Sequence, residues 1–107
     1  MKVYIAGKIT GNPDYKKQFA EAEAELRAAG HITMNPSVLP DGFEWNEYMN
    51  ICFKMIDVCD AVLFMNNWTD SRGAKLEYQY AYLNKKELMF QLNMKKSGIE
   101  REKIGKK

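Results

Sequence analysis

Four short apolar runs alternate with longer polar segments along the chain, and this alternation constrains the fold more than any other feature. The runs are residues 2–6, 31–34, 60–65 and 87–92. Each has the length of a buried strand, and each intervening segment can hold a crossover helix. Strands alternating with helices form a parallel sheet with right-handed crossovers. The sequence therefore predicts an α/β protein, a single-domain Rossmann- or flavodoxin-like three-layer fold with a parallel sheet of four to five strands.

Three helices are expected between these runs, over residues 13–29, about 44–57 and about 71–83. Asn12 precedes the first helix as a favoured N-cap, and Gly30 follows its end. Asp70 or Ser71 can cap the third helix. Apolar residues at helical spacing give the first two helices a buried face. These residues are Tyr15, Phe19, Ala22, Leu26 and Ala29 in the first helix, and Trp45, Tyr48, Met49, Cys52 and Ile56 in the second.

Length and composition narrow the class of protein. A chain of 107 residues with 46% hydrophobic and 28% charged residues fits one globular domain. No apolar run approaches transmembrane length and no signal peptide is visible, so we expect a cytoplasmic protein without membrane contact. Two cysteines and one histidine form neither a disulfide framework nor a metal-ligand pattern. No metal and no cofactor are expected.

The charge is unevenly distributed along the chain. Residues 95–107 hold six basic and two acidic side chains, which makes this segment +4 and the remainder about −2. We therefore predict a folded domain over residues 1–94 and a basic, flexible tail over residues 95–107. The alternative for the tail is contact with nucleic acid. The remainder of the chain shows no basic stripe, so nucleic acid is not an expected partner.

A glycine-containing loop, Gly7 to Gly11, follows the first apolar run. Ligands commonly bind to such loops at the carboxyl end of a parallel strand. The loop lacks the complete dinucleotide-binding fingerprint, and it lacks the Gly-Lys-Ser/Thr ending of a phosphate-binding P-loop. A tight turn without a ligand is the alternative interpretation.

A second candidate segment, D-S-R-G-A-K-L-E-Y at residues 70–78, opens the third helix. Gly73 would let a ligand approach the backbone, and the N–H groups of a helix N-terminus suit a phosphate. Glu77 lies one turn beyond Gly73, about 6 Å along the helix axis. A carboxylate so placed could attack or stabilise an oxocarbenium-like centre. The alternative is a capped amphipathic helix with a surface glutamate.

The topology predicts that the two segments meet. Both follow strands at their carboxyl ends, so they face each other across a switch point if the first and third strands are neighbours. Phe43, Trp45 and Tyr48 cluster at the start of the second helix. They could form the wall of a pocket for a flat base, although a stripe at helical spacing more often belongs to a core.

Several motifs resemble those of one protein family: Y-I-A-G-K-I-T-G at 4–11, N-P at 35–36, F-E-W-x-x-Y-M at 43–49, C-D-A-V at 59–62 and S-R-G-A-K-L-E at 71–77. From residue 2 to about residue 90 the chain resembles a small family of uncharacterised bacterial and bacteriophage proteins related to nucleoside 2-deoxyribosyltransferases. The wider superfamily also includes deoxynucleoside 5′-monophosphate N-glycosidases.

The resemblance implies roles for particular residues. Glu77 matches the carboxylate that attacks the anomeric carbon and forms a glycosyl-enzyme intermediate, and Tyr4 matches a tyrosine near the sugar. The positions that match phosphate-binding segments are Gly7, Lys8, Ile9, Thr10, Ser71 and Gly73, with Lys8 as a phosphate ligand. The base would lie near Trp45 and Tyr48. The ligand would be a nucleoside or a nucleoside monophosphate, and the enzymes of this superfamily are dimers or larger homo-oligomers.

One position departs from the family pattern. The enzymes carry an aspartate eight residues before the aspartate that precedes the third strand, and counting back from Asp60 gives Cys52. A thiol is a poor hydrogen-bond acceptor and proton relay. Asp41 or Glu44 could supply the missing carboxylate. The expected function is cleavage or deoxyribosyl transfer at an N-glycosidic bond; the alternatives are a catalytically impaired nucleotide-binding protein and an interaction protein with a vestigial pocket.

Overall fold

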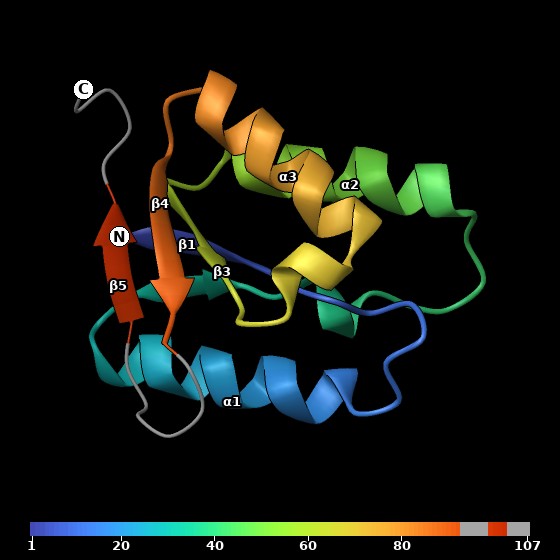
Figure 1. Ribbon diagram of the computed structural model, residues 1–107, viewed down its shortest axis with the longest axis horizontal. Helices are drawn as coiled ribbons and strands as arrows, with labels where there is room; N and C mark the ends of the chain where they lie inside the picture. The colour runs from blue at the N-terminus through green and yellow to red at the C-terminus, as the bar shows by residue number, and fades with distance from the viewer. Residues whose placement is uncertain (93–98, 103–107) are drawn as a thin grey trace.

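The computed structural model describes residues 1–92 and 99–102, with the backbone alone for 99–102. Four strands form a parallel sheet in the order β2-β1-β3-β4 (Figure 1). They are β1 (Lys2–Ala6), β2 (Ile32–Met34), β3 (Ala61–Phe64) and β4 (Glu87–Gln91). The predicted α/β fold and its parallel sheet are therefore confirmed.

Three helices cover the sheet and complete three layers. They are α1 (Tyr15–Ala28), α2 (Trp45–Asp57) and α3 (Arg72–Leu83), with the 3-10 turns η1 (Pro36–Val38) and η2 (Trp68–Asp70). In Figure 1, α1 lies on one face of the sheet, and α2 and α3 lie on the other. Alternate residues of β1 enter the two cores: Val3 and Ile5 pack with Phe19 of α1, whereas Tyr4 packs with Ile56 of α2. Among the described helices, none has the length and apolarity needed to cross a bilayer.

The strand order places the switch point where the sequence predicted it. From β1 the chain passes to β2 on one side and later returns to β3 on the other side, so β1 and β3 are neighbours, with Ala6 opposite Phe64. The loops that leave β1 and β3 therefore emerge next to each other at the carboxyl edge of the sheet. This edge is where a doubly wound sheet offers a crevice to a ligand.

The start of α1 differs from the sequence prediction. The helix begins at Tyr15 rather than at residue 13, and its N-cap is Asp14 rather than Asn12. The Asn12 side chain is engaged elsewhere: its Nδ2 donates to the Lys8 carbonyl at 2.8 Å and to Gln18 Oε1 at 2.8 Å. These contacts hold Asn12 in the loop, and the first helical turn begins after it. At α3 the cap is Ser71, because Asp70 ends η2.

The sheet has a fifth strand, within the predicted four to five, but its position in the chain and its antiparallel direction were not predicted. Residues Ile99–Glu102 form β5, which pairs antiparallel with β4 at the edge of the sheet (Figure 1). The sequence analysis assigns these residues to a flexible tail because of its basic charge. A four-residue segment with three charged side chains also carries little strand signal. The rest of the predicted tail, from residue 95, lies outside the described residues, so the division at residue 94 stays a prediction.

Candidate active site

A cavity of about 480 Å³ opens at the carboxyl edge of the sheet. The loop after β1, the turn after β2, the N-terminal part of α2 and the start of α3 form its walls. The cavity thus brings together most of the residues that the sequence suggested. These are Tyr4, Gly7, Ile9, Thr10, Trp45, Tyr48, Cys52, Ser71, Gly73 and Glu77.

Glu77 lies inside this cavity rather than on the surface, with only 5% of its area exposed. The Tyr4 hydroxyl donates a hydrogen bond of 2.8 Å to Glu77 Oε2. The Cys52 thiol is the third member of this buried cluster and interacts electrostatically with both side chains. The three groups come from β1, α2 and α3. They converge because Tyr4 points to the sheet face that α2 and α3 cover.

Burial controls the protonation of this cluster. Loss of solvent raises the pKa of Glu77 to about 7, although the hydrogen bonds from Tyr4 and Cys52 lower it. Burial, followed by the charge of Glu77, raises the pKa of Cys52 to about 12 and raises the pKa of Tyr4 well above its usual value. Glu77 is therefore the one member of the cluster that changes charge near neutral pH, while Tyr4 and Cys52 remain hydrogen-bond donors.

The first loop is held in place by amide side chains. The Lys8 N–H donates to Asn67 Oδ1 at 3.2 Å, and Asn67 Nδ2 donates to Gln18 Oε1 at 3.3 Å. Gln18 also accepts the hydrogen bond from Asn12, so it links the loops after β1 and β3 to α1. Lys8 is not among the described residues that line the cavity, and its role as a phosphate ligand stays a prediction.

Gly7 is required by packing. A Cβ at this position would lie 2.7 Å from Met65 Sδ and 3.3 Å from Asn67 Oδ1. We therefore expect Gly7→Ala to lower the free energy of unfolding by about 1–3 kcal/mol, as overpacking does. Gly73→Ala is the comparison, because its closest contact is 3.2 Å to the Met49 thioether and alanine favours the helix. Urea denaturation checks both variants, and an equal effect of the two would contradict this assignment.

The start of α3 offers hydrogen-bond donors to the cavity. Ser71 Oγ accepts the Ala74 N–H at 3.0 Å, which leaves the Ser71 O–H free to donate. Within the described chain, the N–H groups of Arg72 and Gly73 have no hydrogen-bond partner. Together with the partial positive charge of the helix N-terminus, these groups suit a bound anion.

Several cavity residues were not anticipated from the sequence. Arg72, inside the S-R-G-A motif, places its guanidinium 4.2 Å from the centre of the Trp45 ring. It is the only Lys or Arg among the described residues that line the cavity. Ser37 also contributes to the walls, together with two acids from segments that the sequence had indicated, Asp41 and Asp70. The Asn35–Pro36 motif could have indicated Ser37, because Ser37 follows it directly in the sequence.

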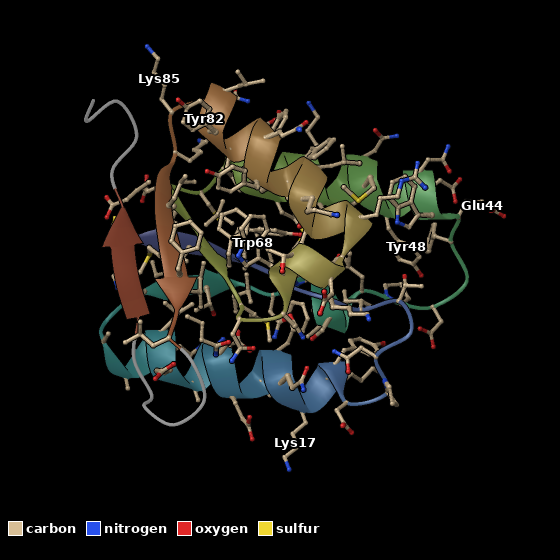
Figure 2. The ribbon with its side chains drawn as sticks, viewed as in Figure 1. Lys17, Glu44, Tyr48, Trp68, Tyr82 and Lys85 are labelled. Carbon is tan, nitrogen blue, oxygen red and sulfur yellow. The ribbon has the colours of Figure 1, made fainter. Side chains whose placement is uncertain are left out.

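The structure separates the two carboxylates that could replace the family aspartate. Asp41 lines the cavity, whereas Glu44 forms the capping box of α2 with Glu47. Figure 2 shows Glu44 at the outer edge of the molecule, with Tyr48 lying further inward. The Tyr48 hydroxyl donates to the Pro40 carbonyl at 2.5 Å and so anchors the loop that carries Asp41.

The aromatic cluster at the start of α2 is divided between cavity and surface. Trp45 and Tyr48 line the cavity, and Trp45 keeps 38% of its area exposed. Phe43 packs edge-on against Tyr48 outside the cavity lining. Further along the helix, Met49 and Cys52 are buried and still line the cavity, whereas Ile56 lies in the core. Within the described residues, no group of three or more His, Cys, Asp or Glu side chains could hold a metal ion.

The fold is shared with 2-deoxyribosyltransferases. The 2-desoxiribosyltransferase from Leishmania mexicana superposes with a TM-score of 0.67 at 21% identity, over 84% of this chain and 63% of that chain. The 2-deoxyribosyltransferase from Bacillus psychrosaccharolyticus superposes with a TM-score of 0.64 at 25% identity, over 84% and 71%. The chain thus spans under two thirds of the length of the Leishmania protein.

Comparison of sequences identifies the family. A family model described as "Domain of unknown function (DUF4406)" matches residues 1–90, and the chain belongs to this family. None of the curated proteins matches it. Family membership, fold and cavity therefore agree with the resemblance that the motifs suggested.

Proposed function

We propose that the protein cleaves or transfers at the N-glycosidic bond of a nucleoside or nucleoside monophosphate, with Glu77 as the nucleophile. The observation that carries this proposal is that the Glu77 carboxylate is buried in the cavity and accepts a hydrogen bond from the Tyr4 hydroxyl. Burying an acid lowers the stability of the fold, and acids with strongly shifted pKa values are concentrated at functional sites. The likeness in fold to 2-deoxyribosyltransferases supports the same reaction class.

In the proposed reaction, a Glu77 oxygen attacks the anomeric carbon of the sugar. The bond from this carbon to the base breaks, its electron pair moves to the base nitrogen, and the base takes up a proton. Water or a second base then displaces Glu77 from the glycosyl ester, which gives hydrolysis or transfer. Tyr4 orients the carboxylate through its 2.8 Å hydrogen bond. Because the pKa of Glu77 is about 7, the reactive carboxylate accumulates above neutral pH.

The cavity offers separate places for a phosphate and a base. Arg72 and the unpaired N–H groups at the start of α3 would bind the phosphate beside the loop of Gly7, Ile9 and Thr10. Trp45 and Tyr48 would flank the base. An assembly of two or more copies and a cytoplasmic location stay expectations from the sequence.

Cys52 favours a second candidate function, nucleotide binding without turnover. The leaving base needs a proton, and a thiol whose pKa is about 12 does not relay protons at neutral pH. The same cavity would then serve a sensor or a protein that sequesters a nucleotide. Both candidates predict a bound nucleoside or nucleotide, and they differ only in the release of free base.

A panel of deoxynucleosides and their 5′-monophosphates tests the proposal. Free base is measured by chromatography, and binding is measured as thermal stabilisation of the protein. Release of free base supports the enzyme. Stabilisation without release supports the binding protein. If the protein shows neither release nor stabilisation, the cavity has no role in nucleotide chemistry.

Replacing Cys52 by aspartate tests the missing proton relay. If Cys52 occupies the position of the family aspartate, Cys52→Asp should raise the rate of base release by about 10-fold or more, because general acid catalysis contributes about 10²–10⁴-fold. Cys52→Asn has nearly the same shape without an acidic proton and is the matched control. The rates of both variants are measured in the chromatographic assay. Equal rates in the two variants would contradict this assignment.

A further inference from the structure

The turn after β2 is fixed by several side-chain hydrogen bonds, although the proposed reaction gives it no role. The Asn35 side chain is buried, its Oδ1 accepts the Ser37 N–H at 2.9 Å, and its Nδ2 donates to Glu23 Oε1 at 3.1 Å. Glu23 on α1 also accepts from the Thr33 hydroxyl at 2.6 Å. These bonds fix the turn to α1, so the residue that follows Pro36 has a defined position.

That residue, Ser37, presents an unsatisfied hydroxyl to the cavity. Only 8% of Ser37 is exposed, it lies on the cavity wall, and its hydroxyl has no hydrogen-bond partner in the described part of the chain. No fully enclosed side-chain nitrogen or oxygen among the described residues lacks a partner, so the Ser37 oxygen opens onto the cavity. A hydroxyl that opens onto a cavity and has no protein partner is available to hydrogen-bond a ligand that displaces water from it.

The strand order indicates which part of an occupant Ser37 meets. The proposed phosphate site lies between the loops after β1 and β3, whereas Ser37 follows β2 on the other side of β1. Neighbouring strands are about 4.8 Å apart, so the ends of β2 and β3 are separated by about 10 Å. In a nucleotide, the phosphate and the base lie at opposite ends of the sugar. A phosphate beside α3 therefore directs the base toward β2.

The surroundings of Ser37 fit a flat heterocycle. Leu39 and Asp41, from the same segment of chain, line the cavity beyond η1, and Trp45 and Tyr48 of α2 line it as well. Figure 1 shows this part of the chain, between β2 and α2, at the end of the sheet where the strands β1 and β3 also end. An aliphatic and aromatic lining with a few fixed polar groups is typical of base-binding sites.

From these observations we infer that Ser37 is a substrate-binding residue whose hydroxyl hydrogen-bonds the polar edge of the nucleobase. A hydroxyl can donate to a ring nitrogen or carbonyl and can accept from an amino group, so it recognises a base without a charge. The inference rests on the proposed function, because it takes a nucleoside or nucleotide as the occupant of the cavity.

The test compares ligands that carry a base with a ligand that lacks one. Ser37→Ala is titrated calorimetrically with the four deoxynucleoside 5′-monophosphates and with 2-deoxyribose 5-phosphate, which has no base. The Glu77→Gln background prevents turnover. We expect Ser37→Ala to weaken the binding of at least one nucleotide by about 3- to 10-fold, the effect of one neutral hydrogen bond, and to leave 2-deoxyribose 5-phosphate unaffected. The melting temperature without ligand should not change, because the hydroxyl has no protein partner.

Thr69→Val is the matched control, since it removes an exposed hydroxyl on η2 that does not line the cavity. An equal loss of affinity for both kinds of ligand would place Ser37 at the sugar or phosphate and overturn the inference. Unchanged affinity for every nucleotide would overturn it as well. If the parent protein binds no nucleotide, the proposed function fails and this inference fails with it.

Discussion

Replacing Glu77 by glutamine is expected to abolish base release while leaving nucleotide binding largely intact. Glutamine keeps the shape of the side chain and an oxygen that accepts the Tyr4 hydrogen bond, but an amide is a poor nucleophile toward an anomeric carbon. The loss of a covalent nucleophile usually costs a factor of about 10³ or more in rate. The measurement is single-turnover release of free base, combined with titration of the same nucleotide.

The control for this substitution is Glu21→Gln, which removes an exposed carboxylate of α1 that does not line the cavity. It should release base at the parental rate. A Glu77→Gln protein that still releases base within about 10-fold of the parent would exclude Glu77 as the nucleophile, since that loss is far below the one expected for a nucleophile. Loss of both binding and release would instead indicate that Glu77 shapes the cavity.

The same substitution should make stability less sensitive to pH. Glu77 has a folded-state pKa of about 7, against an ordinary value of 4.5. At a pH between these two values, the folded protein retains a proton that the unfolded chain has released. This retained proton favours folding at low pH, and its contribution is lost as the pH rises through 7. A shift of this size corresponds to about 3 kcal/mol. The Glu77→Gln variant lacks this dependence.

Urea denaturation at pH 5 and pH 8 measures the effect. The difference in unfolding free energy between Glu77→Gln and the parent should change by about 2.5 kcal/mol in favour of Glu77→Gln from pH 5 to pH 8. Other titrating groups, such as Glu23 and Asp60, are present in both proteins and cancel in the difference. A difference that does not change with pH would mean that Glu77 is ionised in the folded state throughout, and that its burial carries no such cost.

The elements of the fold were predictable because their signals are local. Runs such as residues 2–6 and 60–65 are apolar without interruption, as buried parallel strands are, and helical spacing marked α1 and α2. The errors arose where a segment has partners that its local pattern does not specify. The Asn12 side chain, expected as a helix cap, instead donates to Lys8 and Gln18, and β5 forms by pairing with β4.

The site was predictable in part for the same reason. Glu77 lies one helical turn beyond Gly73 in any α-helix, so its candidacy follows from spacing alone. Sequence spacing does not tell which neighbouring side chains turn toward a cavity. Lys8 was expected at the phosphate and does not line the cavity, whereas Arg72 and Ser37 line it without having been expected.

The sequence by itself determined the α/β class and the alternation of strands and helices along the chain. It also showed an acid one turn beyond a glycine in a capped helix. These properties depend on periodicity and on local hydrogen bonding, which act between near neighbours in the chain. Only the tertiary structure decided that Glu77 is buried, that its pKa is raised to about 7 and that Ser37 lines the same cavity. The physical reason is that burial and hydrogen bonding join groups such as Tyr4 and Glu77, which are 73 residues apart.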